Sequence, residues 1–160
     1  MPDVIVHLWL ATDTFALVSV FDQEFFVLNG FVILPMWQRL NFKFDFKYKK
    51  FYSEILANRI SKRLINIANG LNVDCFDAIV NQLYHKKSFV IIHPEFKYLD
   101  TVWVGSINRI SRKSLFVKTV STLCEDMGII KIHQKDITQI EFLTRYVSIY
   151  ERFSQFYSEA

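Results

Sequence analysis

Two short segments share one pattern, and this repetition constrains the fold more than any other feature of the sequence. Residues 37–42 and 137–142, about a hundred positions apart, both alternate apolar with polar side chains and both end in Phe. Each follows a run rich in strand-forming residues and precedes an amphipathic stretch rich in aromatic residues. Alternation of this kind is typical of a β-strand with one buried face. The sequence therefore predicts two related β units, one in each half of the chain.

The first half has the strand pattern of a small barrel. Runs rich in β-branched and aromatic residues cover 4–10 and 14–21, and the pair Asn29-Gly30 is a strong turn signal between two shorter runs. The alternating run 37–46 follows. About five short strands in so short a segment favour a strongly bent sheet that closes on itself. We therefore predict a small five-stranded β-barrel over residues 1–47.

A change of period after Tyr48 marks a helical bridge between the halves. The apolar residues that fall on one helical face are Phe51, Ile55, Leu56, Ile60, Leu64 and Ile67. Asn69-Gly70 is predicted to end this helix, because both residues accept the left-handed conformation common at helix C-termini. Asp74 is then placed to cap a second helix. The apolar face of that second helix comprises Phe76, Ile79, Val80, Leu83 and Tyr84. The bridge spans residues 48–86.

The second half repeats the strand pattern and adds a terminal helix. Strands are predicted over 88–93, 101–110, 115–121, 128–133 and 137–142. Beyond Thr144, apolar and aromatic residues at helical spacing are Tyr146, Ile149, Tyr150, Phe153, Phe156 and Tyr157. We therefore expect a mainly β protein of the α+β class, with two small five-stranded barrels joined by the helical bridge. The second barrel and its C-terminal helix span residues 87–160.

Several short motifs occur in a distinctive order along the chain. They are Phe15–Val18 and Asn29–Pro35 in the first half, and Gly105–Ile110, Leu115–Val120, Ile137–Phe142 and Thr144–Tyr146 in the second. This arrangement resembles that of uncharacterised bacterial proteins with tandem Sm-like small β-barrels, and the resemblance covers most of the chain. It implies the two-barrel fold. The Arg-Gly pair of RNA-binding Sm-like proteins has no counterpart, since Met127 precedes Gly128, so the resemblance assigns no binding residue.

No pattern of side chains points to catalysis, a cofactor or a metal. The four histidines lie in separate segments without the i, i+4 spacing of a metal site, and Gly is too scarce for a phosphate-binding loop. One enzyme alternative stays open, a small hydrolase in which the fold gathers His93 and His133 with a carboxylate such as Asp100 or Glu141. Because nothing in the sequence requires such a site, we expect that the protein is not an enzyme.

The sequence favours a soluble protein of the reducing cytoplasm. Charged residues interrupt every hydrophobic run before the roughly 18 to 20 residues that a membrane span needs. The N-terminus lacks the cationic region of a secretory signal. Cys75 and Cys124 lie far apart, which favours two free and mostly buried thiols over a disulfide or a zinc site.

One segment concentrates the positive charge. Between residues 39 and 63, eight cations and two carboxylates give +6, whereas the whole chain carries +3. Aromatic and basic residues alternate over 42–48, as in platforms that stack bases and contact phosphates. The same alternation is typical of an amphipathic edge strand with solvated lysines. The candidate partner-binding residues are Arg39, Lys43, Phe44, Lys47, Lys49, Lys50, Arg59, Lys62 and Arg63.

These features predict a non-catalytic binding or regulatory protein that docks another protein, as immunity proteins and inhibitors do. An acidic surface would complement the basic segment. The alternative is an RNA- or single-stranded nucleic-acid-binding Sm-like module that uses residues 39–63. The aromatic C-terminal helix either packs against the barrels or exposes its rings as an interface for a homo-oligomer.

Overall fold

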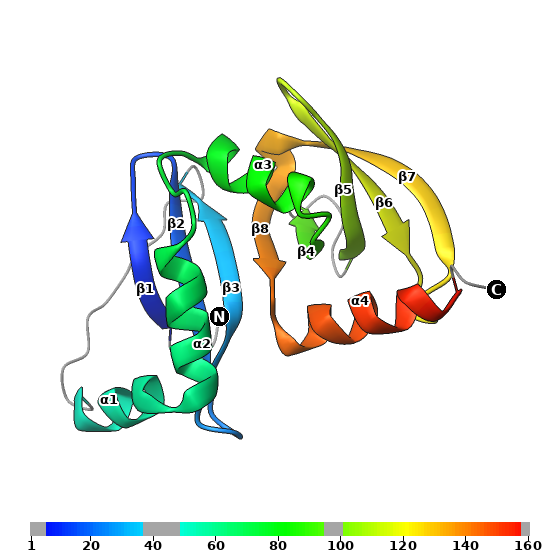
Figure 1. Ribbon diagram of the computed structural model, residues 1–160. Helices are drawn as coiled ribbons and strands as arrows, with labels where there is room; N and C mark the ends of the chain where they lie inside the picture. The colour runs from blue at the N-terminus through cyan, green and yellow to red at the C-terminus, as the bar shows by residue number, and fades with distance from the viewer. Residues whose placement is uncertain (1–5, 37–48, 95–100, 158–160) are drawn as a thin grey trace.

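The computed structural model describes residues 6–36, 49–94 and 101–157 of the chain (Figure 1). In the first half, strands β1 (Val6–Ala11), β2 (Phe15–Asp22) and β3 (Val27–Pro35) are followed by helices α1 (Lys49–Ala57) and α2 (Arg59–Asn69). Helix α3 (Phe76–His85) leads to strands β4 (Phe89–Pro94), β5 (Trp103–Ser111), β6 (Ser114–Val120) and β7 (Asp126–His133). A short 3-10 helix (Gln134–Asp136), strand β8 (Ile137–Phe142) and helix α4 (Arg145–Tyr157) complete the described chain.

All eight described strands belong to one antiparallel sheet with the order β1-β2-β3-β8-β4-β5-β6-β7. Strands β1 and β7 lie at opposite edges, so the sheet is open. The prediction of two closed five-stranded barrels is therefore wrong. The reason lies in β8, which was expected to close the second barrel and instead pairs with β4 along one edge and with β3 along the other. The predicted strand at 37–46 lies outside the described residues.

The Asn29-Gly30 turn is also wrong, because both residues lie inside β3. Between Val18 and Val20 the register with β2 shifts, so β3 carries a bulge there, and Gly30 has a φ of +60°. A Cβ atom at Gly30 would lie 2.4 Å from the backbone nitrogen of Thr144. The glycine therefore lets β3 bulge and pass close to the chain that leaves β8.

The helices predicted over residues 48–86 are confirmed in outline and corrected in detail, although they do not bridge two barrels. One long helix was expected, but it is divided at Asn58, whose side chain accepts a hydrogen bond from the N–H of Ile60 (2.9 Å) and caps α2. Helix α2 ends at Asn69 as predicted, although Gly70 has a φ of −95° and is not left-handed. The N-cap of α3 is Cys75 rather than Asp74.

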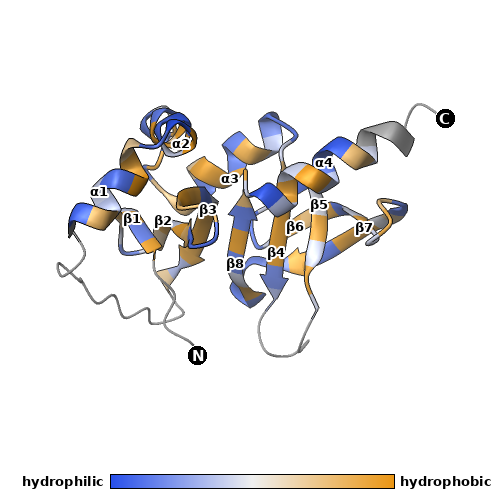
Figure 2. Cartoon of the chain, turned by 90° about the horizontal axis from the view of Figure 1, so that it is seen from below, coloured by the Kyte–Doolittle hydropathy of each residue, from blue (hydrophilic) through white to orange (hydrophobic). Residues whose placement is uncertain are grey.

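One hydrophobic core runs through both halves of the sheet. It joins residues of the N-terminal strands and of α1 and α2 with the buried face of α3, which comprises Phe76, Ile79, Val80 and Leu83. These four residues were predicted, and the fifth predicted residue, Tyr84, is only partly buried. On the opposite face of the C-terminal strands, Val147 and Tyr150 of α4 pack against Ile91 and Val104. Strand β4 is therefore covered on both faces, which explains its continuous apolar run. Figure 2 shows β4 largely in the hydrophobic colour, whereas α2 and α4 carry both kinds of residue.

Two predictions about the chain as a whole concern its cysteines and its hydrophobic segments. Cys75 and Cys124 are free thiols, as expected, but Cys75 is exposed and Cys124 only partly buried, so their expected burial is wrong. Among the described helices, none has the length and apolar character required to cross a bilayer.

Candidate functional site

Helix α2 presents a basic face to the solvent. Ser61 and Leu64 are its buried residues, and the Ser61 hydroxyl accepts the backbone N–H of Leu28 at 3.0 Å, which fixes the helix on β3. Arg59, Lys62 and Arg63 are exposed. They follow the i, i+3, i+4 spacing that puts side chains on one helical surface. We call these three cations the basic face.

The cations of the basic face have no acidic partner among the residues that the structure describes, where the ion pairs involve other side chains. Helices α1 and α2 together contain five cations and a single carboxylate, that of Glu54. An uncompensated positive surface of this kind attracts and orients anionic partners.

The predicted partner-binding residues are only partly visible. Arg39, Lys43, Phe44 and Lys47 lie outside the described residues, and of Lys49 only the backbone, at the start of α1, is described. Lys50 is exposed on α1, and the other three form the basic face of α2. The structure thus brings three of the nine candidates together on one helical surface.

An aromatic surface near α2 was not predicted as a site. Phe25 and Phe26 form the turn between β2 and β3, where they are 50% and 55% exposed. Phe51 of α1 is 40% exposed and meets the Phe26 ring edge-on, with 5.8 Å between ring centroids. We call these three rings the aromatic tip. Its sequence signal is a pair of Phe residues directly after the polar stretch 22–24. The sequence pattern places this pair instead at the start of the first of the two shorter runs that flank Asn29-Gly30, a strand predicted over 25–28, whereas β3 begins at Val27.

The aromatic tip is held in place by polar contacts. One carboxylate oxygen of Asp22 accepts the backbone N–H groups of Glu24 and Phe25 at 3.1 and 3.2 Å. The guanidinium of Arg145, at the start of α4, lies 3.9 Å from the Phe25 ring centroid and 3.8 Å from the Asp22 carboxylate. Phe26 has a φ of +51°. That left-handed backbone costs a bulky residue on the order of 1–3 kcal/mol, so the surrounding contacts must stabilise it.

The structure brings together two of the side chains named for a histidine–carboxylate site, His93 and Glu141. His93 Nε2 lies 2.7 Å from Glu141 Oε1, across the β4–β8 ladder. The same oxygen accepts a hydrogen bond from the Gln139 amide at 2.7 Å. His133 is elsewhere, 3.2 Å from the hydroxyl of Ser114, and Asp100 lies outside the described residues. The structure therefore forms one His–Glu pair whose contacts are made within the sheet. No group of three or more ligating side chains that could hold a metal occurs in the described chain.

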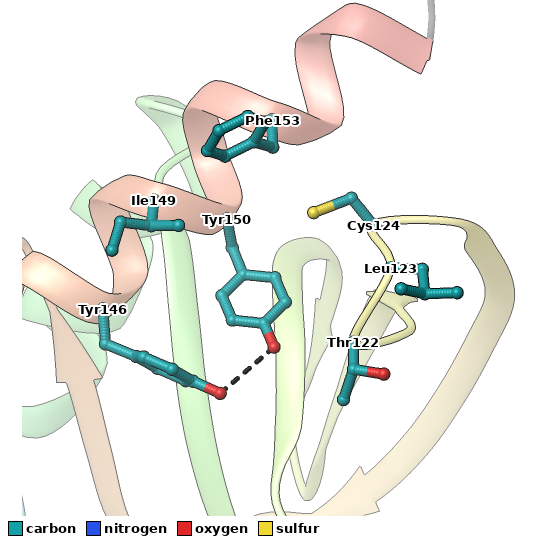
Figure 3. Close-up of a pocket in the computed structure, with 7 residues that line it drawn as sticks. All are labelled: Thr122, Leu123, Cys124, Tyr146, Ile149, Tyr150 and Phe153. Atoms are coloured by element: carbon teal, nitrogen blue, oxygen red, sulfur yellow. Dashed lines mark hydrogen bonds between the residues drawn. The ribbon is translucent and has the colours of Figure 1, made fainter.

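Helix α4 borders a shallow groove (Figure 3). Its volume is about 300 Å³, and it is lined by Thr122, Leu123, Cys124, Tyr146, Ile149, Tyr150 and Phe153. The hydroxyls of Tyr146 and Tyr150 are 3.1 Å apart, and this hydrogen bond, with burial, raises the pKa of Tyr150 to about 12. Tyr150 is buried, whereas Tyr146, Ile149 and Phe153 are about half exposed. Both expectations for this helix are thus met in part, since it packs on the sheet and also exposes rings, and homo-oligomerisation through it stays a prediction.

Comparison with protein-family models, with curated proteins and with solved structures gave no match. The resemblance to tandem Sm-like proteins therefore stays a prediction, and function has to be argued from the side chains themselves.

Proposed function

We propose that this chain is a non-catalytic binding protein of the cytoplasm that docks an acidic protein partner, as an inhibitor or immunity protein does. The observation that carries the proposal is the basic face of α2, three exposed cations without a described acidic partner. Because Ser61 and Leu64 fix the opposite side of the helix, the cations project from a backbone that is held in place on the sheet. A charged surface on a fixed backbone loses less entropy on docking than one on a flexible segment.

A protein partner is favoured over a single-stranded nucleic acid by the state of the nearby rings. Proteins that bind single strands stack bases on free aromatic faces. Here Arg145 already covers one face of Phe25, and Phe26 and Phe51 contact each other edge-on. The rings that the structure describes beside α2 therefore offer fewer free faces to bases, whereas no described carboxylate pairs with the cations of the basic face.

The test is an affinity pull-down from native cells after nuclease treatment, with wild type and the variant Lys62→Glu/Arg63→Glu. The matched control is Arg112→Glu/Lys113→Glu in the β5–β6 turn, which changes the net charge equally at exposed residues. We expect wild type and control to retain one stoichiometric protein and the α2 variant to lose it. Equal retention by the α2 variant would refute the proposal.

The nucleic-acid alternative predicts a different result in the same experiment. The chain would then retain a bound partner only from a lysate that was not treated with nuclease. Its affinity for a labelled single-stranded oligonucleotide would fall steeply with salt. The slope of log affinity against log salt would then become shallower in Lys62→Glu/Arg63→Glu. These results together would identify RNA or single-stranded DNA, rather than a protein, as the partner.

A further inference from the structure

We infer that the aromatic tip is the apolar anchor of the docking surface, and that the partner segment it accepts carries apolar side chains beside acidic ones. The inference rests on the proposed function and specifies the chemistry of the partner. The proposed docking surface then comprises the basic face of α2 together with Phe25, Phe26 and Phe51.

The exposure of the tip is unusual for such large apolar side chains. Phe26 and Phe51 contact each other at one end of the β2–β3 hairpin, Phe25 precedes Phe26 in the same turn, and all three rings remain 40–55% exposed. Contiguous exposed apolar surface surrounded by polar residues is typical of interaction sites. Large buried anchors of this kind carry most of the binding energy in protein interfaces.

The tip is also organised before any partner binds. Asp22 fixes the turn through two backbone N–H groups, and Arg145 fixes the Phe25 ring from a different helix. Phe26 keeps a left-handed backbone although glycine would adopt it more readily. Unfavourable conformations that are maintained by their surroundings cluster at functional sites. An anchor that is ordered beforehand loses little entropy on binding.

The tip and the basic face belong to one surface. The hydrogen bond from Leu28 to Ser61 joins the base of the tip to the first turns of α2, and Phe51 contacts Phe26 from α1. Figure 1 shows the β2–β3 turn beside the corner between α1 and α2. The exposed Lys50 precedes Phe51 on α1, and the basic face belongs to the helix that is fixed beside the turn. Charge complementarity then favours a protein segment in which Asp or Glu residues flank the apolar residues that cover the tip.

The test uses a photo-crosslinking phenylalanine derivative in the full chain, expressed in native cells. It replaces Phe26 in the tip, Lys62 in the basic face, or Lys113 as an exposed control. We expect positions 26 and 62 to crosslink to the same polypeptide, and position 113 to give no such product. Peptide mapping should place the crosslink from position 26 in a segment with apolar and acidic residues together.

Each other outcome is decisive. A crosslink from position 62 without one from position 26, or one from position 26 to a segment without acidic residues, would overturn the anchor and leave the proposed function intact. Crosslinks from position 26 to lipid alone would identify a membrane surface instead and overturn the inference. Absence of a protein crosslink from both positions would refute the inference and the proposed function together.

A second variant separates loss of the anchor from loss of the fold. Phe26→Asn removes the ring and retains a residue that tolerates the left-handed backbone. Met127→Asn, at a residue that is 63% exposed on β7, removes an apolar side chain elsewhere that is slightly more exposed than Phe26. We expect an affinity loss of about tenfold or more for Phe26→Asn and little change for Met127→Asn, with similar thermal unfolding. Unchanged affinity in a folded Phe26→Asn variant would overturn the anchor.

Discussion

Helices α2 and α4 both cover the sheet with one side, but they expose opposite kinds of surface on the other. Helix α2 buries Ser61 and Leu64 and exposes cations. Helix α4 buries Val147 and Tyr150 and leaves Tyr146 and other apolar side chains about half exposed. The comparison shows that the spacing of apolar residues in a helix does not indicate how many of those residues the fold will bury. In α2 the sheet buries Leu64 and part of Ile67 but leaves Ile60 55% exposed, and in α4 Tyr146, Ile149 and Phe153 stay about half exposed.

The largest expected effect comes from Gly30 of β3, the strand that holds α2, at the point where this strand passes close to the start of α4. Gly30 of β3 passes against the backbone of Thr144, immediately before α4. Gly30→Ala should lower the free energy of unfolding by about 3 kcal/mol or more, because a Cβ collides with backbone atoms and φ is positive. Urea denaturation measures this change.

The control for that experiment is Gly70→Ala. A Cβ at Gly70 meets its nearest atom at 3.6 Å, an ordinary contact, and φ is negative. We expect a change within about 0.5 kcal/mol. Equal effects of the two substitutions would show that the close approach of β3 to the start of α4 does not limit stability.

The next largest effect concerns the attachment of α2. Ser61→Ala removes the acceptor of the Leu28 N–H and should lower the free energy of unfolding by about 1–3 kcal/mol, since a buried donor is left unsatisfied. Asn66→Ala, at an exposed position of the same helix, should change it by less than about 0.5 kcal/mol. A neutral Ser61→Ala would mean that packing of Leu64 alone holds α2.

The exposed side of α4 provides a test with little effect on folding. If its apolar residues mediate homo-oligomerisation, wild type should show concentration-dependent association in analytical ultracentrifugation. Ile149→Glu, at a half-exposed residue, should then be monomeric, while Lys62→Glu should still associate. A wild type that stays monomeric at high concentration would exclude this role for α4.

The smallest effect is a titration. The pKa of Tyr150 is raised to about 12 through its hydrogen bond with Tyr146 and its burial, so the folded state favours the neutral phenol. This stabilisation is fully present below pH 10 and is lost as the pH rises from about 10 through 12. Tyr146→Phe should bring the pKa of Tyr150 closer to 10, as measured by the ultraviolet absorbance of tyrosinate. An unchanged titration would show that the hydrogen bond does not set this pKa.

Much of the secondary structure was predictable because it depends on local periodicity. The strands of the second half and the buried face of α3 follow directly from the spacing of apolar residues. The pairing of β8 was not predictable in this way. Both edges of a strand carry the same backbone groups whatever its sequence, so periodicity does not reveal whether β8 pairs with β3 as well as β4.

The candidate site shows the same division. The basic face could be predicted because the charge and the helical spacing of residues such as Lys62 and Arg63 are properties of the sequence. The aromatic tip was not, because Phe25 and Phe26 have the composition of a buried strand. Their exposure depends on Asp22 and on Arg145, which is 120 positions beyond Phe25 in the sequence.

The position of β8 has a consequence for synthesis of the protein. The backbone edges of β3 and β4 that β8 covers stay unpaired until residue 142 has left the ribosome. At typical elongation rates, the interval between translation of β3 and of β8 is roughly 5 to 20 seconds. During that interval the nascent chain exposes two strand edges that can pair with other chains. Premature termination before β8 would make this exposure permanent, so truncated products should be prone to aggregation and should depend on chaperones or proteolysis for their removal.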